Sequence, residues 1–294
     1  MSVSRRFGIG LRGNLRPGEY GRLARLAEDL GFDVVTAFHD LGDQPAIVPL
    51  VEVAQATGRV TLGPACLNPY TMHPVEIESV VATLDSIAAG RVYLGLARGA
   101  WLDTIGIDPR DAVARVRAAA EFVRARHQVP LLIGGWGPRM VALAGEIADE
   151  LKVGGSANPA IVPVMRERLG GDRTGIVLGA VTVIDPDRKA ARSRALAAVQ
   201  PYFEVVARLD PTLTGAPGRI TDELLDLFAF AGTPGDVARQ VDAIFAAGAS
   251  RVEFGAPFGL THEGGIRLLA DHVLSQRRAT WEGRARRKNR SGRP

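Results

Sequence analysis

The chain has only one cysteine, Cys66, in 294 residues. A single thiol cannot form an internal disulfide, and alone it cannot supply a set of metal ligands. The five histidines are scattered, without the spacing of a metal-binding motif. We therefore expect no bound metal. Because the chain also lacks an export signal, we expect it in the cytoplasm, where thiols stay reduced.

Other common signatures are missing as well. No run of about 18 apolar residues is present, so we expect no membrane span and no membrane partner. The chain contains no G-x-S-x-G nucleophile motif and no Walker loop for nucleotide phosphates. A mechanism that relies on a metal or on an activated nucleophile therefore has no support from motifs.

Basic residues are concentrated at the carboxyl end. The net charge is +4, but residues 277–294 hold eight Lys or Arg and one Glu, so the rest of the chain carries −3. A basic run of this kind is typical of a disordered, solvated tail and less often of an arm that binds anions. Since the remaining chain is slightly acidic, we expect no nucleic-acid partner.

Short apolar runs alternate with amphipathic runs along the chain. Eight of them have the length and the Val, Ile and Leu content of buried strands: 6–11, 33–38, 59–63, 91–97, 129–135, 150–154, 174–185 and 250–257. Helical runs follow, such as the one that Pro74 opens and the one between Thr233 and Gly248. This alternation predicts an α/β fold, a (β/α)8 TIM barrel.

Residues 1–276 are expected to form this single barrel domain. The segment 200–231 breaks the alternation with additional helical runs, and we interpret it as an insertion near the C-terminal face of the barrel. Residues 277–294 are the basic tail. An open, doubly wound sheet is the alternative, but its glycine-rich turn should follow the first strand, whereas Gly8 and Gly10 lie within that strand.

Reactive groups of a barrel lie where its strands end. The candidates are Asn14, His39, Asp40, Cys66, Asn68, Arg98, Asp103, Trp136, Arg139, Ser156, Phe258 and His262. The loop GGWGPRM, residues 134–140, has glycines that let a ligand approach, and it opens a helix whose free amides suit a phosphate. The loop GLARGAWLDTIGI, residues 95–107, is similar in kind. Either loop can also be only a turn.

Four blocks of sequence occur in a characteristic order: LAEDLGFDVV, RVTLGPACLNPYTMHPVEIESVVATLDSIAAGRVYLGLARG, VPLLIGGWGPRMVALAGEIADEL and AGTPGDVARQVDAIFAAGASRVEFGAP. Together they resemble the bacterial luciferase-like oxidoreductase family over most of residues 5–275. The chain is most similar to the coenzyme F420-dependent branch, which includes the methylenetetrahydromethanopterin reductases. The resemblance implies a (β/α)8 barrel that holds a flavin or the deazaflavin F420 in its mouth.

The resemblance also implies roles for single residues. The family has a cis peptide bond without proline behind the central ring of the cofactor, and the matching bond is Ala65–Cys66. The other matches are expected to bind the cofactor: Asn68 by a hydrogen bond, Arg98 and Gly99 beside the ring with Asp103 close by, and Gly135, Trp136, Gly137, Arg139 and Met140 in a phosphate-binding turn.

Candidate proton-transfer residues follow the second strand. His39 is the best candidate acid or base, because an imidazole titrates near neutral pH; alternatively it only donates a hydrogen bond to the cofactor. Asp40 either orients His39 or caps the following segment. Many F420-dependent relatives carry the order Asp-His here, which is reversed in this chain. Cys66 is interpreted as a small packing residue.

Several side chains have two open interpretations. Arg98 either holds an acidic group of substrate or cofactor or pairs with Asp103. Trp136 either stacks on the cofactor or covers its turn. A third set, Phe228, Phe230 and Trp101, forms either an apolar substrate wall or core packing.

The acids used by two F420-dependent relatives are missing. Gly10 stands where the reductases carry an acid in strand one, and Ala100 stands where sugar-phosphate dehydrogenases carry one after strand four. Neither reaction can therefore be transferred to this chain. We predict an oxidoreductase that transfers a hydride between coenzyme F420 and a small organic substrate. The alternatives are an FMN-dependent monooxygenase and a non-catalytic F420-binding relative. The resemblance also implies a homodimer.

Overall fold

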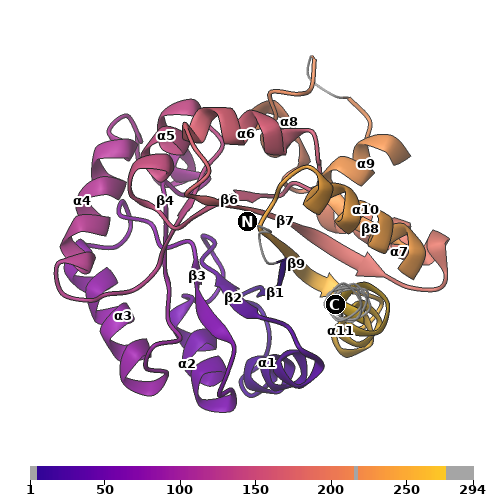
Figure 1. Cartoon of the computed structure of the whole chain (residues 1–294), viewed down its shortest axis with the longest axis horizontal. Helices are drawn as coiled ribbons and strands as arrows, with labels where there is room; N and C mark the ends of the chain where they lie inside the picture. Colours follow the sequence, from indigo (N-terminus) through magenta and orange to yellow (C-terminus); the bar gives the residue numbers. More distant parts are fainter. Residues whose placement is uncertain (1–4, 215–217, 276–294) are drawn as a thin grey trace, which may run out of the picture.

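The computed structural model describes residues 5–214 and 218–275, in which parallel strands form a barrel surrounded by helices (Figure 1). The strands are β1 (Arg6–Leu11), β2 (Val34–Phe38), β3 (Thr61–Ala65), β4 (Leu94–Ala97), β5 (Leu131–Gly134), β6 (Glu150–Gly154), β7 (Gly175–Ile184), β8 (Ala229–Gly232) and β9 (Arg251–Phe258). Bonded neighbours follow the order β3-β2-β1-β9-β7-β6-β5-β4. Parallel bridges Leu62–Val92 and Leu67–Leu96 close the ring. The predicted (β/α)8 barrel is confirmed.

The helices pack outside the strands and mostly begin where the sequence predicts. They are α1 (Glu19–Leu30), α2 (Ile47–Ala56), α3 (Pro74–Ile87), α4 (Ala112–Arg124), α5 (Pro138–Ile147), α6 (Ile161–Leu169), α7 (Arg188–Val199), α8 (Phe203–Leu209), α9 (Asp222–Phe228), α10 (Pro234–Ala246) and α11 (His262–Leu269), with a 3-10 helix η1 (Leu102–Ile105) and a π-helical turn η2 (Ala270–Leu274). Pro74 and Pro234 occupy first-turn positions that need no amide donor. Thr233 caps α10 in a reciprocal capping box.

The segment 200–231 contains the additional helices that the sequence predicts, and it also contains part of a strand. It contains α8 and α9, but its last three residues belong to β8, which pairs parallel with the carboxyl half of β7. The short run AFAG gives no periodic signal of its own. Its strand conformation depends on the length of β7, whose residues 175–179 pair with β6 and whose residues 181–184 pair with β8. The predicted tail, residues 277–294, lies outside the described residues.

Aromatic rings fill the core around β9. Phe7 and Phe254 stack with ring centroids 6.3 Å apart, and Phe230 meets Phe254 edge to face at 5.5 Å. Phe228 and Phe230 are completely buried, so they belong to the core and not to a substrate wall. The described part of the chain contains no helix long and apolar enough to cross a bilayer.

Candidate functional site at the barrel mouth

The junction between β3 and α3, residues 66–73, is held by bonds at both ends. Its first peptide bond, Ala65–Cys66, is cis, as the family resemblance predicts. Leu67 donates its amide to the Gly95 carbonyl at 2.9 Å and accepts the Ala97 amide at 3.1 Å. The His73 side chain caps the first turn of α3. The junction is therefore a fixed part of the barrel rim.

Asn68 lies within this junction and is 4% exposed. Its Oδ1 accepts the Tyr70 amide at 2.9 Å. Its Nδ2 lies against Gly99, the residue that follows β4 and Arg98: a Cβ built on Gly99 would come within 2.0 Å of Asn68 Nδ2. Gly99 also has a φ of +88°, which glycine adopts without steric cost. Two residues predicted to bind the cofactor thus contact each other.

The Cys66 thiol fills the space where three strands end. A Cβ built on Gly134, the last residue of β5, would lie 3.0 Å from Cys66 Sγ and 3.2 Å from Ala97 Cβ. Burial raises the pKa of the Cys66 thiol to about 12. The thiol is therefore protonated at neutral pH and is not a nucleophile, as its interpretation as a packing residue requires.

His39 and Asp40 lie after β2 at the same rim. His39 is half-buried, and its Nδ1 accepts the Ala46 amide at 3.2 Å, so Nε2 carries the proton of the neutral ring. Burial lowers the pKa of His39, which keeps the imidazole neutral at pH 7. Desolvation and the nearby Asp43 carboxylate raise the pKa of Asp40. The amide of the following segment is accepted by His39, not by Asp40.

The ring of Phe38, the last residue of β2, lies on the inner surface of β1. A Cβ built on Gly10 would come within 2.3 Å of Phe38 Cζ. No side chain fits at position 10 while this ring keeps its place. Position 10 therefore carries no acid, and the Phe38 ring occupies the volume that a side chain there would need.

The segment after β4 is exposed. Arg98 donates from Nε to the Gly99 carbonyl at 3.2 Å, and among the described residues it forms no ion pair with Asp103, so that interpretation of Arg98 is wrong. Asp103 is exposed at the start of η1. Trp101 is 41% exposed and has a φ of +54°, a conformation that is uncommon for a bulky residue. It does not belong to the core.

The turn between β5 and α5 combines buried and exposed residues. Trp136 is 8% exposed, and its Nε1 donates to the Gly154 carbonyl at 3.1 Å, so its ring covers the turn and is anchored to β6. Gly135 donates its amide to the Lys152 carbonyl at 3.1 Å, and a Cβ there would come within 2.7 Å of Met140 Cγ. This half of the predicted turn therefore supports its shape.

The other half of the turn suits an anion. Gly137 is the N-cap of α5, and no side chain accepts the amides of the first turn. Arg139 follows within that turn and is exposed. Pro138 carries no N–H group and the Met140 amide donates to the Gly137 carbonyl, so the groups that fit a phosphate are the amides of Gly137 and Arg139, the positive end of the helix dipole and the Arg139 guanidinium.

Four other strand-end candidates contribute little to the mouth. Asn14 is exposed, and Phe258 is buried. Ser156 is also buried, and its hydroxyl accepts the Asn158 amide at 3.2 Å. His262 contacts the Pro257 carbonyl at 3.0 Å through Nδ1. The described residues hold no group of three or more His, Cys, Asp or Glu side chains that could bind a metal.

Sequence reasoning missed a charged group inside the barrel. Lys152 in β6 forms an ion pair with Glu253 in β9, and both side chains are buried. Thr36 donates to the other oxygen of Glu253 at 2.8 Å. Burial opposes the ionisation of Glu253, but Lys152 and Arg251 outweigh it and lower the pKa of Glu253. The available signal in the sequence is two charged residues within each of two apolar strands, Glu150 and Lys152 in ELKVG and Arg251 and Glu253 in RVEFGAPF.

The barrel mouth therefore brings together most of the predicted site: His39 after β2, Cys66 and Asn68 after β3, Gly99 after β4, and the turn after β5. It combines a neutral imidazole donor, a carboxamide and an anion site on one rim. Such a rim can orient a planar ligand that carries a phosphate. Arg98 and Asp103 lie outside this contact group.

Known proteins resemble the chain over nearly its whole length or over about half of it. The 5,10-methylenetetrahydromethanopterin reductase of Archaeoglobus fulgidus is 25% identical over 331 residues, which covers 92% of this chain and 98% of that protein. An F420-dependent glucose-6-phosphate dehydrogenase of Nakamurella multipartita is 31% identical over 172 residues, with 45% and 51% covered.

The structure of the coenzyme F420-dependent tetrahydromethanopterin reductase from Methanopyrus kandleri superimposes with a TM-score of 0.77 at 23% identity and covers 94% of this chain and 99% of that one. At this identity the match supports the fold alone. The family model for luciferase-like monooxygenases matches residues 1–128 and 119–251. The chain therefore belongs to the luciferase-like monooxygenase family.

Proposed function

We propose that this protein is an oxidoreductase that transfers a hydride between coenzyme F420 and a small organic substrate. The observation that carries the proposal is the end-to-end similarity to a methylenetetrahydromethanopterin reductase, supported by a partial match to an F420-dependent dehydrogenase. The substrate is kept to a broad class because positions 10 and 100 carry no acid, and Phe38 occupies the volume at position 10.

The rim residues suit the cofactor. The uncapped start of α5 and Arg139 would hold its phosphate. Asn68, fixed through Tyr70, would orient the edge of the ring system with its carboxamide. His39 would donate from Nε2 to the ring or to the substrate, because its Nδ1 is already bonded to the Ala46 amide. When bound, the deazaflavin supplies the carbon centre that accepts or releases the hydride.

Cofactor titration tests the proposal. Purified protein is titrated with F420 and, separately, with FMN, and binding is followed by fluorescence. We expect tight binding of F420 and weak binding of FMN. Comparable FMN binding together with oxygen uptake would instead favour an FMN-dependent monooxygenase. F420 binding without turnover on a panel of alcohols, aldehydes and enones would favour a non-catalytic relative.

Arg139 offers a residue-level test of the phosphate site. Arg139→Ala should weaken F420 binding by about 1–3 kcal/mol, because a charge-assisted hydrogen bond to phosphate is lost. Arg25→Ala, which removes another exposed arginine from α1, is the control and should leave the affinity unchanged. Equal affinity of Arg139→Ala and wild type would remove Arg139 from the site.

We also propose a homodimer, on the basis of the family resemblance. Two exposed valines support an apolar contact surface on neighbouring helices: Val48 on α2 is 46% exposed and Val75 on α3 is 48% exposed. Sedimentation equilibrium of the wild type and of Val48→Asp tests this proposal. We expect a dimer for the wild type and a shift toward monomer for the variant.

A further inference from the structure

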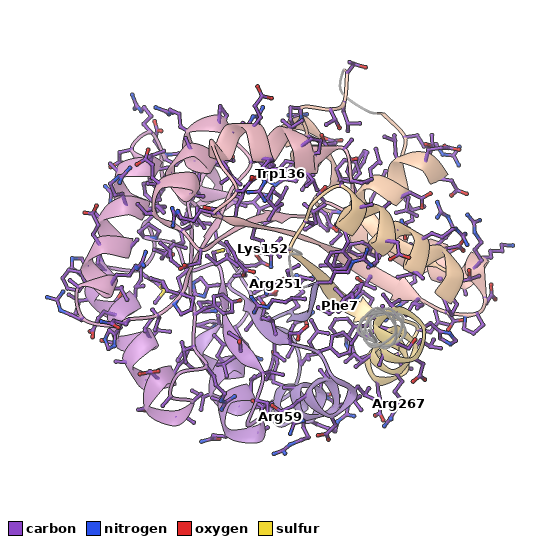
Figure 2. The ribbon with its side chains drawn as sticks, in the orientation of Figure 1. Phe7, Arg59, Trp136, Lys152, Arg251 and Arg267 are labelled. Atoms are coloured by element: carbon purple, nitrogen blue, oxygen red, sulfur yellow. The ribbon has the colours of Figure 1, made fainter. Side chains whose placement is uncertain are left out.

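A column of alternating charges runs through the interior of the barrel. Figure 2 shows Lys152 and Arg251 near the centre of the barrel, inside the ring of strands. The column begins where the strands start: Arg6 Nη1 lies 3.4 Å from Glu150 Oε1, and Glu150 Oε2 accepts from Arg251 Nη2 at 2.7 Å. These residues are the first ones of β1, β6 and β9.

The column continues toward the mouth. Arg251 Nη1 lies 3.4 Å from Glu253 Oε2, and Glu253 Oε1 pairs with the Lys152 ammonium group. The Arg251 and Glu253 side chains are 0% exposed, and that of Lys152 is 8% exposed. The order of charges is therefore plus, minus, plus, minus, plus, which leaves one net positive charge, and Lys152 is the last cation.

Lys152 lies at the level of the strand ends. It pairs in register with Gly134, the last residue of β5. Its Nζ lies 4.8 Å from the centroid of the Phe38 ring, and Phe38 is the last residue of β2. Its charge also acts on Cys66 and Asp40, both of which belong to the mouth. The ammonium group therefore lies against the Phe38 ring, close to the mouth.

Stability alone does not account for this arrangement. Buried ion pairs contribute little net stability compared with apolar residues of similar volume, because both charges must be desolvated. Lysine is also rare in this chain: of 36 basic residues only Lys152, Lys189 and Lys288 are lysines. A buried lysine at the end of a charge column near a ligand site can stabilise negative charge on the ligand.

The proposed reaction supplies that use. A hydride leaves a C–H bond of the substrate with its electron pair and forms a C–H bond at the central ring of the cofactor. When bound, the cofactor would take up the hydride with its two electrons and would gain one unit of negative charge, while the oxidised substrate would release one proton to solvent. A fixed cation near the mouth would favour the more negative form of the cofactor.

We infer that Lys152 acts on the cofactor through its charge. Its ammonium group, which Glu253 holds below the mouth, stabilises the reduced cofactor relative to the oxidised one. This inference rests on the proposed function. It assigns a role to a residue that needs no direct contact with the substrate.

The test compares the affinity of F420 and of chemically reduced F420 for wild type and Lys152→Met, under anaerobic conditions. The methionine keeps the length of the side chain and removes the charge. We expect the affinity for reduced F420, divided by the affinity for oxidised F420, to fall about tenfold in the variant. The midpoint potential of bound F420 should fall correspondingly by about 30 mV for this two-electron couple.

Two further variants keep the inference falsifiable. Lys189→Met removes an exposed lysine from α7 and should leave the ratio unchanged. Glu253→Gln keeps the ammonium group but removes its counter-charge, and should shift the ratio in the opposite direction to Lys152→Met. If Lys152→Met does not fold, as thermal melting would reveal, Glu253→Gln alone decides the question.

Failure of the inference and failure of the proposed function give different results. A folded Lys152→Met variant with an affinity ratio within twofold of wild type would overturn the inference while F420 binding stands. Wild type that binds neither F420 nor FMN would overturn the proposed function itself, and the inference with it. If FMN binds instead, the same ratio is measured with oxidised and reduced FMN, and a ratio that does not depend on Lys152 overturns the inference there as well.

Discussion

Two neighbouring segments of the barrel mouth differ sharply in how they are held. The β3–α3 junction, residues 66–73, buries Leu67, Asn68 and Pro69 and exchanges backbone hydrogen bonds with β4. The β4–α4 segment, residues 98–111, buries Leu102 alone among its described residues. The side chains of Arg98 and Thr104 donate hydrogen bonds to carbonyl groups of the same segment.

This difference indicates that the two segments have different roles. A junction that is buried and bonded on both sides can position a cofactor reproducibly. A segment that exposes Trp101 and Ile105 and is bonded mainly to itself can change sequence and shape without disturbing the barrel. We expect the first segment to determine stability and cofactor placement, and the second to determine substrate preference.

The largest expected effect comes from Gly99, where the two segments touch. Gly99→Ala should lower the free energy of unfolding by about 2–5 kcal/mol, because φ is unfavourable for alanine and the new Cβ would collide with Asn68 Nδ2. Gly106→Ala is the control: its φ is +71° but no atom lies within 4 Å of the new Cβ. It should cost only about 1–2 kcal/mol. Equal losses in urea denaturation would show that the contact between the segments is unimportant.

The next effect contrasts one polar residue of each segment. Asn68→Ala should destabilise the protein by about 1–3 kcal/mol, since the amide of Tyr70 loses its buried acceptor. Asp103→Ala removes an exposed carboxylate from the other segment and should stay within about 0.5 kcal/mol of wild type. Under the proposed function only Asn68→Ala should also weaken F420 binding. A larger loss of stability for Asp103→Ala would contradict the conclusion that residues 66–73 contribute more to stability than residues 98–111.

A smaller effect is expected from the hydrogen bond that links the segments. Tyr70 Oη donates to Asp111 Oδ1 at 2.5 Å, and Arg115 stacks over the Tyr70 ring. Burial and the Asp111 carboxylate raise the pKa of Tyr70 to about 12. Tyr70→Phe should cost about 0.5–1.5 kcal/mol.

Hydrogen exchange distinguishes the segments in this variant. We expect faster exchange in Tyr70→Phe for residues 98–111 and unchanged exchange for residues 66–73. Uniform acceleration of both would mean that the junction is not held independently.

The smallest expected effect is the pH dependence of stability that comes from His39, a half-buried residue after β2. Burial lowers the pKa of His39 below the value near 6.5 of an unfolded chain, so the unfolded state binds the proton more readily. The stability contributed by neutral His39 is complete above about pH 6.5 and is lost as the pH falls toward the lower pKa of the folded state.

Melting temperatures at pH 7.5 and 5.5 measure this loss. His39→Asn keeps an acceptor for the Ala46 amide and should fall less than wild type on acidification. The same substitution at exposed His272 is the control and should behave like wild type. A drop as steep in His39→Asn as in wild type would place the titrating group elsewhere.

Local patterns made much of the fold predictable. Pro74 and the pair Thr233 and Pro234 predict helix starts because their effects act within one turn. The alternation of strands and helices predicts the barrel, since parallel strands need crossover helices. Residues at strand ends were then assigned to one rim, and contacts of Cys66 with Gly134 and of Asn68 with Gly99 agree with that assignment.

Features that depend on distant partners could not be predicted in this way. The strand β8 is four residues long and needs the second half of β7 as its partner. The sequence leaves two interpretations of Trp136 open, and only the hydrogen bond from its Nε1 to the Gly154 carbonyl decides between them. Lys152 and Glu253 stand out as charged residues within apolar strands, but they are 101 positions apart, so no local pattern reveals that they pair.

The sequence by itself determined the alternation of strands and helices apart from β8, the helix starts at Pro74 and Thr233, and the set of residues at the strand ends. Each of these depends on neighbours within a few residues. Only the tertiary structure decided that Phe38 occupies the volume at Gly10, that Arg98 stays apart from Asp103, and that a charge column ends on Lys152 beneath the mouth. These depend on the direction in which side chains point once the barrel closes, and closure brings together strands from opposite ends of the chain.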